Sequence, residues 1–370
     1  TPCGTLFPYT TLFRSVEDGA DNVYWGDIHF HSNVSQDVMM QGIDNAPEEC
    51  YQYARDVSGL DFAALTDHHQ PVFRTEPLVL ERGLGLTAER WERSKDVTEQ
   101  FNQDGAFATF LGCEFRTQRG DTNVYFRDPA RAPYLPGQLD SLRRVHAYCR
   151  GLAFFTAPHL HPYSHQYLTL GPWKWDKEVL DRWQEIHGDA EPVIEIFSRH
   201  GRYEFYGNQP HISPRRGMTE GNSVQAHLLR GHRFGLYAGS DDHWGRPGQD
   251  GLMAVYAPEL TRHAIFDAIC KRRCYGTTNA RILVDVRVNG RRMGESSVSD
   301  DRTQLWAEVH GTDIIERIDV IRDGRILHTV EPTSEDGTVA YEDPMPVLGT
   351  CFYYLRVLQR DEHMAWSSPV

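Results

Sequence analysis

The sequence predicts an α/β protein with a closed barrel of parallel strands followed by a small antiparallel β-sandwich. In the first 280 residues, short apolar runs alternate with helical segments, which is typical of buried parallel strands in α/β proteins. From about Asn279 onward, apolar and polar residues alternate and turn signals recur at short intervals. We therefore expect a non-native or unstructured leader over residues 1–20, a barrel over 21–280 and a β-sandwich over 281–370.

Six of the apolar runs end on polar residues of the metal-ligand type. They comprise residues 23–28, 60–65, 107–113, 152–158, 193–198 and 234–240. The C-terminal strand ends of a closed α/β barrel all open on one face, so residues at those ends converge whatever their distance in sequence. Imidazole and carboxylate groups that converge there would bind divalent metal, and more than one ion.

Helices are predicted between these strands. The first follows Asn45–Glu48, which supplies an N-cap residue and an early proline and glutamate, and it ends near Val57. Segments 137–151 and 221–231 are expected to form two more. After Pro258, apolar residues recur at helical spacing up to Ile269. If this helix forms the junction with the β-sandwich, deleting the sandwich should expose its apolar stripe.

The C-terminal ninety or so residues read as short strands joined by tight turns. A strand over 282–288 turns at Asn289-Gly290, and another over 318–322 turns at Asp323-Gly324. Further strands are expected over 305–309, 326–330 and 351–358. Because this part holds no cluster of ligand-type residues, we expect it to be structural, with Trp306 and Trp366 as core anchors.

Three pairs of ligand-type residues have the spacing of a strand, the third being His159 and His161. His29 and His31, like Asp241 and His243, lie two residues apart, so each pair projects from one side of its strand. Histidines satisfied within a core are the alternative interpretation. Asp37 lies in a polar turn, where helix capping is the competing role.

The remaining candidates follow the other apolar runs. An unpaired carboxylate at Glu114 would be costly to bury, so a cation is its natural partner, with an arginine salt bridge as the alternative. The others are His68, His159 and His200. We expect His69 to point outward, Glu195 to be structural and His161 to lie behind His159.

The motifs His29-Phe30-His31, Thr66-Asp67-His68 and Ser240–His243 resemble those of the polymerase and histidinol phosphatase (PHP) superfamily. The resemblance implies a distorted (β/α)7 barrel that holds two or three divalent ions, namely zinc, manganese or iron. Carried over by position, it implies these ligands: His29, His31, Asp37, His68, Glu114, His159, His200, Asp241 and His243. Segments 254–281, 289–294 and 365–369 resemble an uncharacterised branch known mainly as a domain of unknown function.

This resemblance implies a multinuclear metal-dependent hydrolase that uses a metal-bridging hydroxide, with Glu114 and Asp241 at its centre. Arg202 and Arg246 are candidate binders of an anionic group, with ordinary loop arginines as the alternative. The expected substrate is a phosphate ester of a small molecule. A hydrolase of carboxyl esters, amides or sulfate esters is the first alternative, and an inactive glycan- or partner-binding protein is the second.

Composition excludes several other classes. The formal charge of −14 argues against a large nucleic-acid partner, and the chain has no apolar run of the ~20 residues that a spanning helix needs. GxSxG and HExxH motifs are absent from the sequence. In the insertion over 160–192, Trp173, Trp175 and Trp183 are candidates for stacking on a sugar or aromatic substrate, with loop packing as the alternative.

Cysteine usage and the first residues bear on localisation. Seven cysteines without CxxC spacing indicate reduced thiols, which favours the cytoplasm slightly. Residues 1–15 resemble a translated sequencing adapter, as found in metagenomic sequences, so we expect the native N-terminus to be missing. The oligomeric state is not predicted by the sequence.

Overall fold

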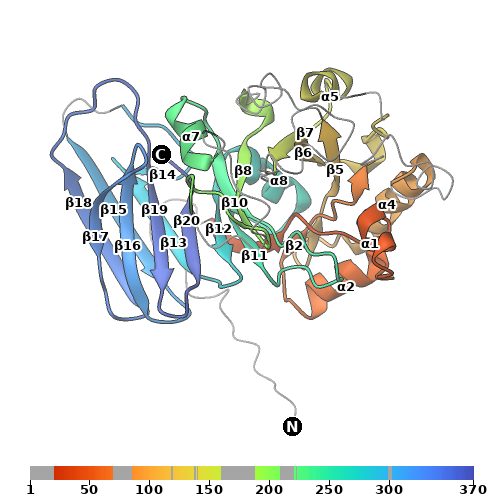
Figure 1. Ribbon diagram of the computed structural model, residues 1–370, viewed down its shortest axis with the longest axis horizontal. Coiled ribbons are helices and arrows are strands. Elements are labelled where there is room, and N and C mark those ends of the chain that lie inside the picture. Colours follow the sequence, from red (N-terminus) through yellow and green to blue (C-terminus); the bar gives the residue numbers. More distant parts are fainter. Residues whose placement is uncertain are drawn as a thin grey trace, which may run out of the picture.

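The protein is a mixed α/β structure whose described strands form four hydrogen-bonded sheets. The computed structural model describes residues 21–69, 86–117, 120–136, 139, 141–159, 188–208, 221, 223–298 and 302–370. Figure 1 shows the part that carries the helices on the right and the C-terminal strands, drawn in blue, on the left.

One sheet runs through both parts. Its nine strands, in spatial order, are β17 (Arg325–Val330), β16 (Ile315–Arg322), β19 (Tyr353–Gln359), β20 (Met364–Ser367), β12 (Cys274–Thr278), β11 (Gly251–Ala257), β1 (Asn22–Asp27), β2 (Phe62–Ala63) and β4 (Ala108–Thr109). β12 pairs with β20 in the antiparallel direction, with Tyr275 opposite Ser367. Hydrogen bonding therefore crosses residue 280, and the predicted division into two domains stays a prediction.

Three smaller sheets complete the described strands. They are β10 (Gly235–Ala238), β8 (Val193–Ser198) and β9 (Gly201–Arg202); β3 (His68–His69), β5 (Leu111–Thr117), β6 (Gly120–Phe126) and β7 (Phe154–Pro158); and β14 (Arg291–Arg292), β13 (Leu283–Val288), β15 (Thr303–His310) and β18 (Asp336–Asp343). β6 is antiparallel to β5 and β7, and β11 is antiparallel to β1. The described strands do not form one closed ring, so the expected (β/α)7 barrel is not confirmed.

The α-helices are α1 (Gln36–Met40), α2 (Pro47–Asp56), α4 (Ala88–Phe101), α5 (Leu142–Tyr148), α7 (Val224–Leu229) and α8 (Arg262–Cys270), and short 3-10 helices span Pro129–Arg131 and Gly188–Ala190. α2 begins as predicted, but Ala46 takes the N-cap position, where its N–H donates to Glu49 at 2.8 Å. Ile265 and Ile269 of α8 pack with Phe110 and Val255, so this stripe covers the N-terminal core and not the junction.

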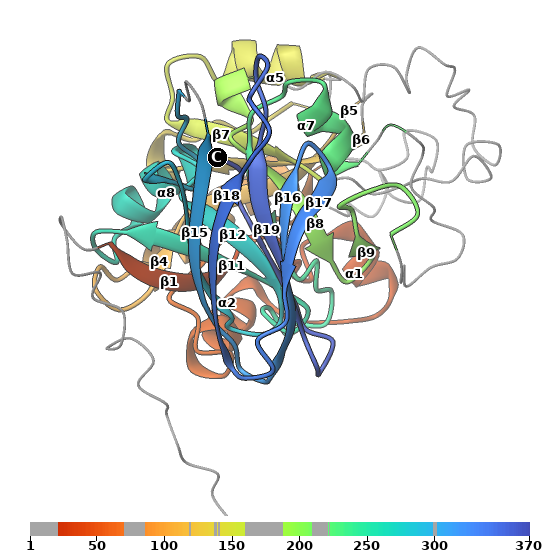
Figure 2. The same cartoon turned by 90° about the vertical axis from the view of Figure 1, so that its left-hand side faces the viewer.

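The C-terminal strands belong to two sheets, the four-stranded sheet of β13, β14, β15 and β18 and the antiparallel end of the nine-stranded sheet, and both contribute to one apolar cluster (Figure 2). Val286 and Ala307 enter this cluster from one sheet, and Val320 and Leu355 enter it from the other. Both predicted turns are present, with positive φ at Asn289 and Gly290 (48° and 75°) and at Asp323 and Gly324 (49° and 74°). Such pairs of positive φ angles fit the twist of a tight hairpin.

The two tryptophans predicted as core anchors differ. Trp366 on β20 is fully buried, whereas Trp306 on β15 is 42% exposed, so the expectation for Trp306 is wrong. Buried and more exposed residues alternate along β15, and Trp306 falls on the exposed face. Single large apolar residues on a protein surface are common.

Several expectations fall outside the described residues. These are the leader over 1–20, His161, and the tryptophans at 173, 175 and 183. Cys50, Cys113, Cys149, Cys270, Cys274 and Cys351 are free thiols. Among the residues that the structure describes, no helix is both long and apolar enough to cross a membrane.

β10 leads directly to Asp241 and lies against the backbone of β12. A methyl group added at Gly276 would lie 2.7 Å from the Ala238 nitrogen and 2.8 Å from the Tyr237 carbonyl carbon. Neither atom can move without shifting β10, so glycine is needed at this approach.

We therefore predict that Gly276→Ala lowers the free energy of unfolding by about 1–3 kcal/mol through overpacking. Chemical denaturation of the metal-free protein measures this. Gly349→Ala is the control, because its added methyl meets nothing within 4 Å and only the positive φ opposes it, at roughly 1 kcal/mol. Equal destabilisation by both substitutions would show that the β10–β12 approach is not tight.

Candidate metal centre

The nine residues that we predicted as metal ligands come together from separate segments. His29 and His31 follow β1, Asp37 lies in α1, His68 lies in β3, Glu114 lies in β5, His159 follows β7, His200 lies between β8 and β9, and Asp241 and His243 follow β10. The sequence had indicated that Glu114 follows the end of a strand. In the structure it lies in the middle of β5. Its register partner on β3 is His68, and neighbours in register share one face of a sheet.

Glu114 and Asp241 face the two histidines that follow β1. The Nε2 atom of His31 lies 3.3 Å from Glu114 Oε2 and 3.1 Å from Asp241 Oδ1. The Nε2 atom of His29 lies 3.5 Å from each of the same oxygens. All four side chains are buried, and their ligand atoms lie within 4.8 Å of one another.

Asp241 also takes part in a second group. Its other oxygen, Oδ2, lies 2.8 Å from His200 Nε2 and 3.7 Å from His159 Nε2. The backbone of Asp241 has a φ of 51°, a conformation that aspartate adopts more readily than most residues. One carboxylate therefore lies between two sets of histidines.

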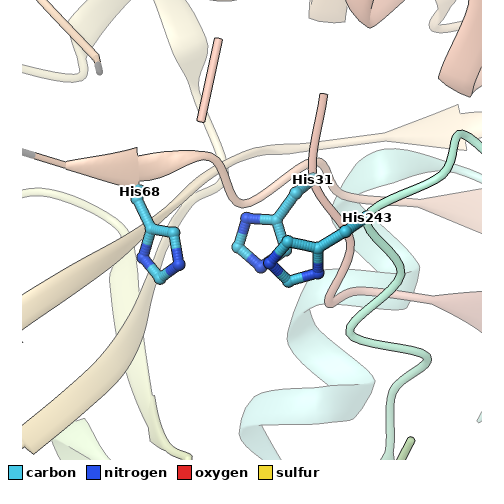
Figure 3. A group of neighbouring side chains, drawn as sticks. All are labelled: His31, His68 and His243. Carbon is cyan, nitrogen blue, oxygen red and sulfur yellow. The ribbon is translucent and has the colours of Figure 1, made fainter. Parts of the chain in front are cut away.

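A third group contains His31, His68 and His243 (Figure 3). Figure 3 shows the His31 and His243 rings nearly side by side, with His68 across from them. Asp37 Oδ2 lies 2.6 Å from His243 Nε2 and 3.3 Å from His68 Nε2. Glu114 Oε2 lies 3.3 Å from His68 Nδ1, so Glu114 connects this group to the first.

Buried carboxylates fix the orientation of the imidazole rings. Glu195 is fully buried and contacts His29 Nδ1 at 2.8 Å and also His159 Nδ1. Both rings thereby turn their Nε2 atoms towards Asp241. The sequence indicated only a structural residue at this position, whereas Glu195 also forms a possible ligand group with His29 and His159. Carboxylate partners of this kind set the tautomer and basicity of metal-binding histidines.

Asp27 is a site residue that sequence reasoning missed. Its carboxylate accepts hydrogen bonds from the N–H groups of His29 (3.0 Å), Ser240 (3.1 Å) and Gly248 (2.8 Å). Burial raises the pKa of Asp27 to about 7 despite these donors. An aspartate within an apolar run, two residues before the histidine pair, was the available signal.

The residues present fit a divalent metal. Among the residues that the structure describes, the buried Nε2 atom of His29 has no hydrogen-bond partner, which is unusual for a polar atom. Burial lowers the pKa of His31, but Asp241 and Glu114 outweigh it and raise that pKa to about 10. Imidazole nitrogens with carboxylate oxygens are the donors that zinc, manganese and iron accept.

The role of the two predicted anion-binding arginines stays a prediction, because the contacts described for them involve other groups than the nine candidate ligands. Arg202 on β9 has Glu204, Glu362 and Arg356 as its charged neighbours, and Arg246 is exposed, with its backbone N–H bound to Asp242. His69, expected to point outward, is 1% exposed. It packs against Phe115 and Tyr134, and burial lowers its pKa to about 3.

Residues 18–73 and 232–312 match the model of a family described as a protein of unknown function, DUF3604. The matched segments contain His29, His31, Asp37, His68, Asp241 and His243, and leave Glu114, His159 and His200 outside.

The chain is also similar to uncharacterised proteins of Chlamydia. It is 24% identical to one from Chlamydia pneumoniae and 25% identical to one from Chlamydia muridarum, over 95% and 94% of this chain. The chain spans 58% and 57% of those relatives' lengths. A two-domain protein from Bacteroides vulgatus, described as containing a predicted PHP-like metal-dependent phosphoesterase, is 14% identical, with a TM-score of 0.45 over 95% of this chain and 96% of that one.

We predict that Glu195→Gln weakens metal binding roughly 10- to 100-fold, because the neutral amide orients His29 and His159 less strongly. Competition with a chromophoric chelator measures the affinity. Asp343→Asn is the control, since Asp343 is also buried but binds Arg322 and Tyr353 far along the chain. Unchanged affinity in Glu195→Gln would remove its assigned role.

A pH dependence is expected for the metal-free protein. The pKa of His31 in the folded state, about 10, is above its unfolded value of about 6.5. The stabilisation by its proton is complete below pH ~6.5 and is lost as the pH rises through about 10. Urea denaturation should therefore show a falling midpoint from about pH 7 to about pH 10, less so in His31→Gln, and a midpoint that rises over this interval would contradict the assignment.

Proposed function

We propose that the protein is a multinuclear metal-dependent hydrolase that cleaves phosphate esters of small molecules. The observation that carries the proposal is the bridging position of two carboxylates, Glu114 and Asp241, among three adjoining groups of histidines. Bound divalent cations would supply Lewis-acid polarisation of the ester and lower the pKa of a water molecule.

Exposure of the side chains indicates where a substrate would enter. His29, His31 and Glu114 are at most 3% exposed, which places them at the bottom of the centre. His200 and Asp37 are 18% and 40% exposed, and they belong to the groups on either side. A substrate would approach past these outer ligands.

Charge favours an anionic substrate. Three divalent cations would more than neutralise the carboxylates of Asp37, Glu114 and Asp241, so the loaded centre would attract an anion. Arg199, next to His200, lies with its guanidinium carbon 3.7 Å from the ring centre of Trp244, which follows His243. This pair lies beside the outer ligands, so Arg199 is a better-placed cation than Arg202 or Arg246.

A substrate panel on metal-loaded protein tests the proposal. We expect turnover of chromogenic phosphate esters, lost on chelation, restored by zinc or manganese, and reduced at least 100-fold in Glu114→Gln, consistent with loss of a bridging ligand. The panel includes mono-, di- and triesters of phosphate, carboxyl esters, amides and sulfate esters.

The other possible results of the substrate panel would each change a different part of the proposal. Exclusive turnover of carboxyl esters, amides or sulfate esters would keep the hydrolase and replace the substrate class. Turnover that survives chelation would contradict metal dependence, and the absence of turnover with all of them would favour a glycan- or partner-binding protein.

A further inference from the structure

We propose that Glu204 positions His200, and that the C-terminal sheets thereby control one part of the metal centre. The inference rests on the proposed metal-binding role of His200. It assigns to residues beyond 315 an effect on metal binding, although the metal-ligand groups described above contain no residue beyond His243.

His200 lies on a small hairpin. β9 contains two residues and pairs with β8 only through Phe197 with Arg202 and Ser198 with Gly201. A hairpin of this length is marginally stable by itself, so contacts outside it must fix the position of His200. His200 is also more exposed, at 18%, than His159 and Asp241 in the same group, at 2% and 4%.

The hairpin is held from outside by the pairing of β8 with β10 and by the Arg199 N–H, which donates to Ser240 O at 3.3 Å. Glu204, two residues after β9, supplies a further outside contact. Its carboxylate is fully buried and accepts hydrogen bonds from Tyr354 Oη at 2.6 Å, Trp366 Nε1 at 3.0 Å and Arg356 Nη1 at 3.2 Å. All three donors lie on β19 or β20. A buried carboxylate is strongly held by such partners, because any displacement leaves its charge uncompensated.

Arg356 connects Glu204 to the rest of the C-terminal sheets. Its Nη2 and Nε atoms bind Asp319 Oδ2 on β16 at 2.8 and 3.1 Å. Asp319 in turn accepts a hydrogen bond from Thr329 on β17 at 2.8 Å. Two buried carboxylates from different parts of the chain therefore share one guanidinium.

Tyr203, which lies between the hairpin and Glu204, contacts residues of the hairpin and of the metal centre. Its N–H donates to Ile196 O at 2.7 Å, and its hydroxyl lies 3.3 Å from Ser198 Oγ. Its ring meets the ring of His159 edge-on, with centroids 6.2 Å apart. A shift of Glu204 would move Tyr203 and His200 together, against the same histidine group.

Arg356→Gln and Arg322→Gln form a matched pair for the test. Both arginines are buried in the C-terminal sheets, at 8% and 9% exposure, and each binds an aspartate at 2.8 or 2.7 Å. Arg322 binds Asp343, which Tyr353 also contacts, and its other polar partners among the described residues are Asp323 and the carbonyls of Met345 and Pro346.

The readout is metal binding and not activity. Elemental analysis after zinc loading and dialysis, with chelator competition, should show that Arg356→Gln loses one metal equivalent or binds it at least 10-fold more weakly, while Arg322→Gln matches the wild type. His200→Ala should lose the same equivalent, and the double variant His200→Ala/Arg356→Gln should lose no more.

Tyr354→Phe removes the hydroxyl that donates to Glu204 with little change of shape, and it is the second variant in case Arg356→Gln does not fold. Full metal content in both of these variants, or equal loss in Arg356→Gln and Arg322→Gln, would overturn the inference. Wild-type protein that binds no metal would overturn the inference and the proposed function together. Protein that binds metal but cleaves no ester would contradict only the proposed function.

Discussion

Asp241 holds a buried carboxylate whose two oxygens face different histidines, His31 on one side and His200 on the other. A carboxylate in this environment is costly to bury without compensating positive charge. In the metal-free protein, protons on the histidines supply that charge, and the pKa values of both Asp241 and Glu114 are held well below their usual range, because the neighbouring histidines outweigh the effect of burial. Metal ions would replace those protons at the same atoms.

The rest of the structure places Asp241 from several sides. Its N–H donates to His29 O at 2.6 Å, and Asp27 ties the residue before it to the end of β1. Gly276 lets the backbone of β12 approach β10, the strand that leads to Asp241. The nine-stranded sheet thus joins the C-terminal strands to β1, the strand that leads to His29 and His31, and Glu204 adds a side-chain connection to the hairpin of His200.

The sequence predicted the convergence of the nine candidate residues better than the topology that produces it. The spacing of two residues between His29 and His31 is a local property. It places both side chains on one side of the chain, whether the neighbouring strand is parallel or antiparallel. Strand direction depends on long-range pairing, and β6, which begins with polar residues, has no local signal that would mark it as an antiparallel strand between β5 and β7. The mixed α/β class was therefore predictable, whereas the division into four sheets was not.

The contrast between local spacing and long-range packing also explains where individual residues differ from their predicted positions. Burial of His69 and exposure of Trp306 depend on which segments pack over them, which no period in the sequence encodes. Arg202 was proposed as an anion binder because it follows His200. No signal in the sequence marked Glu204, Glu362 and Arg356 as its charged neighbours. Asp27 and Glu204 are polar residues among apolar ones, and their roles require knowing which N–H groups and which guanidinium face them.

The most direct test of the metal centre is a crystal structure of the protein grown with zinc or manganese, with anomalous scattering recorded at the absorption edge of the metal. We predict at least two anomalous peaks, one next to each oxygen of Asp241, at about 2.0–2.2 Å, with Glu114 and His200 on opposite sides of the pair. Peaks confined to the protein surface, or none beside Asp241 at saturating metal, would contradict the account.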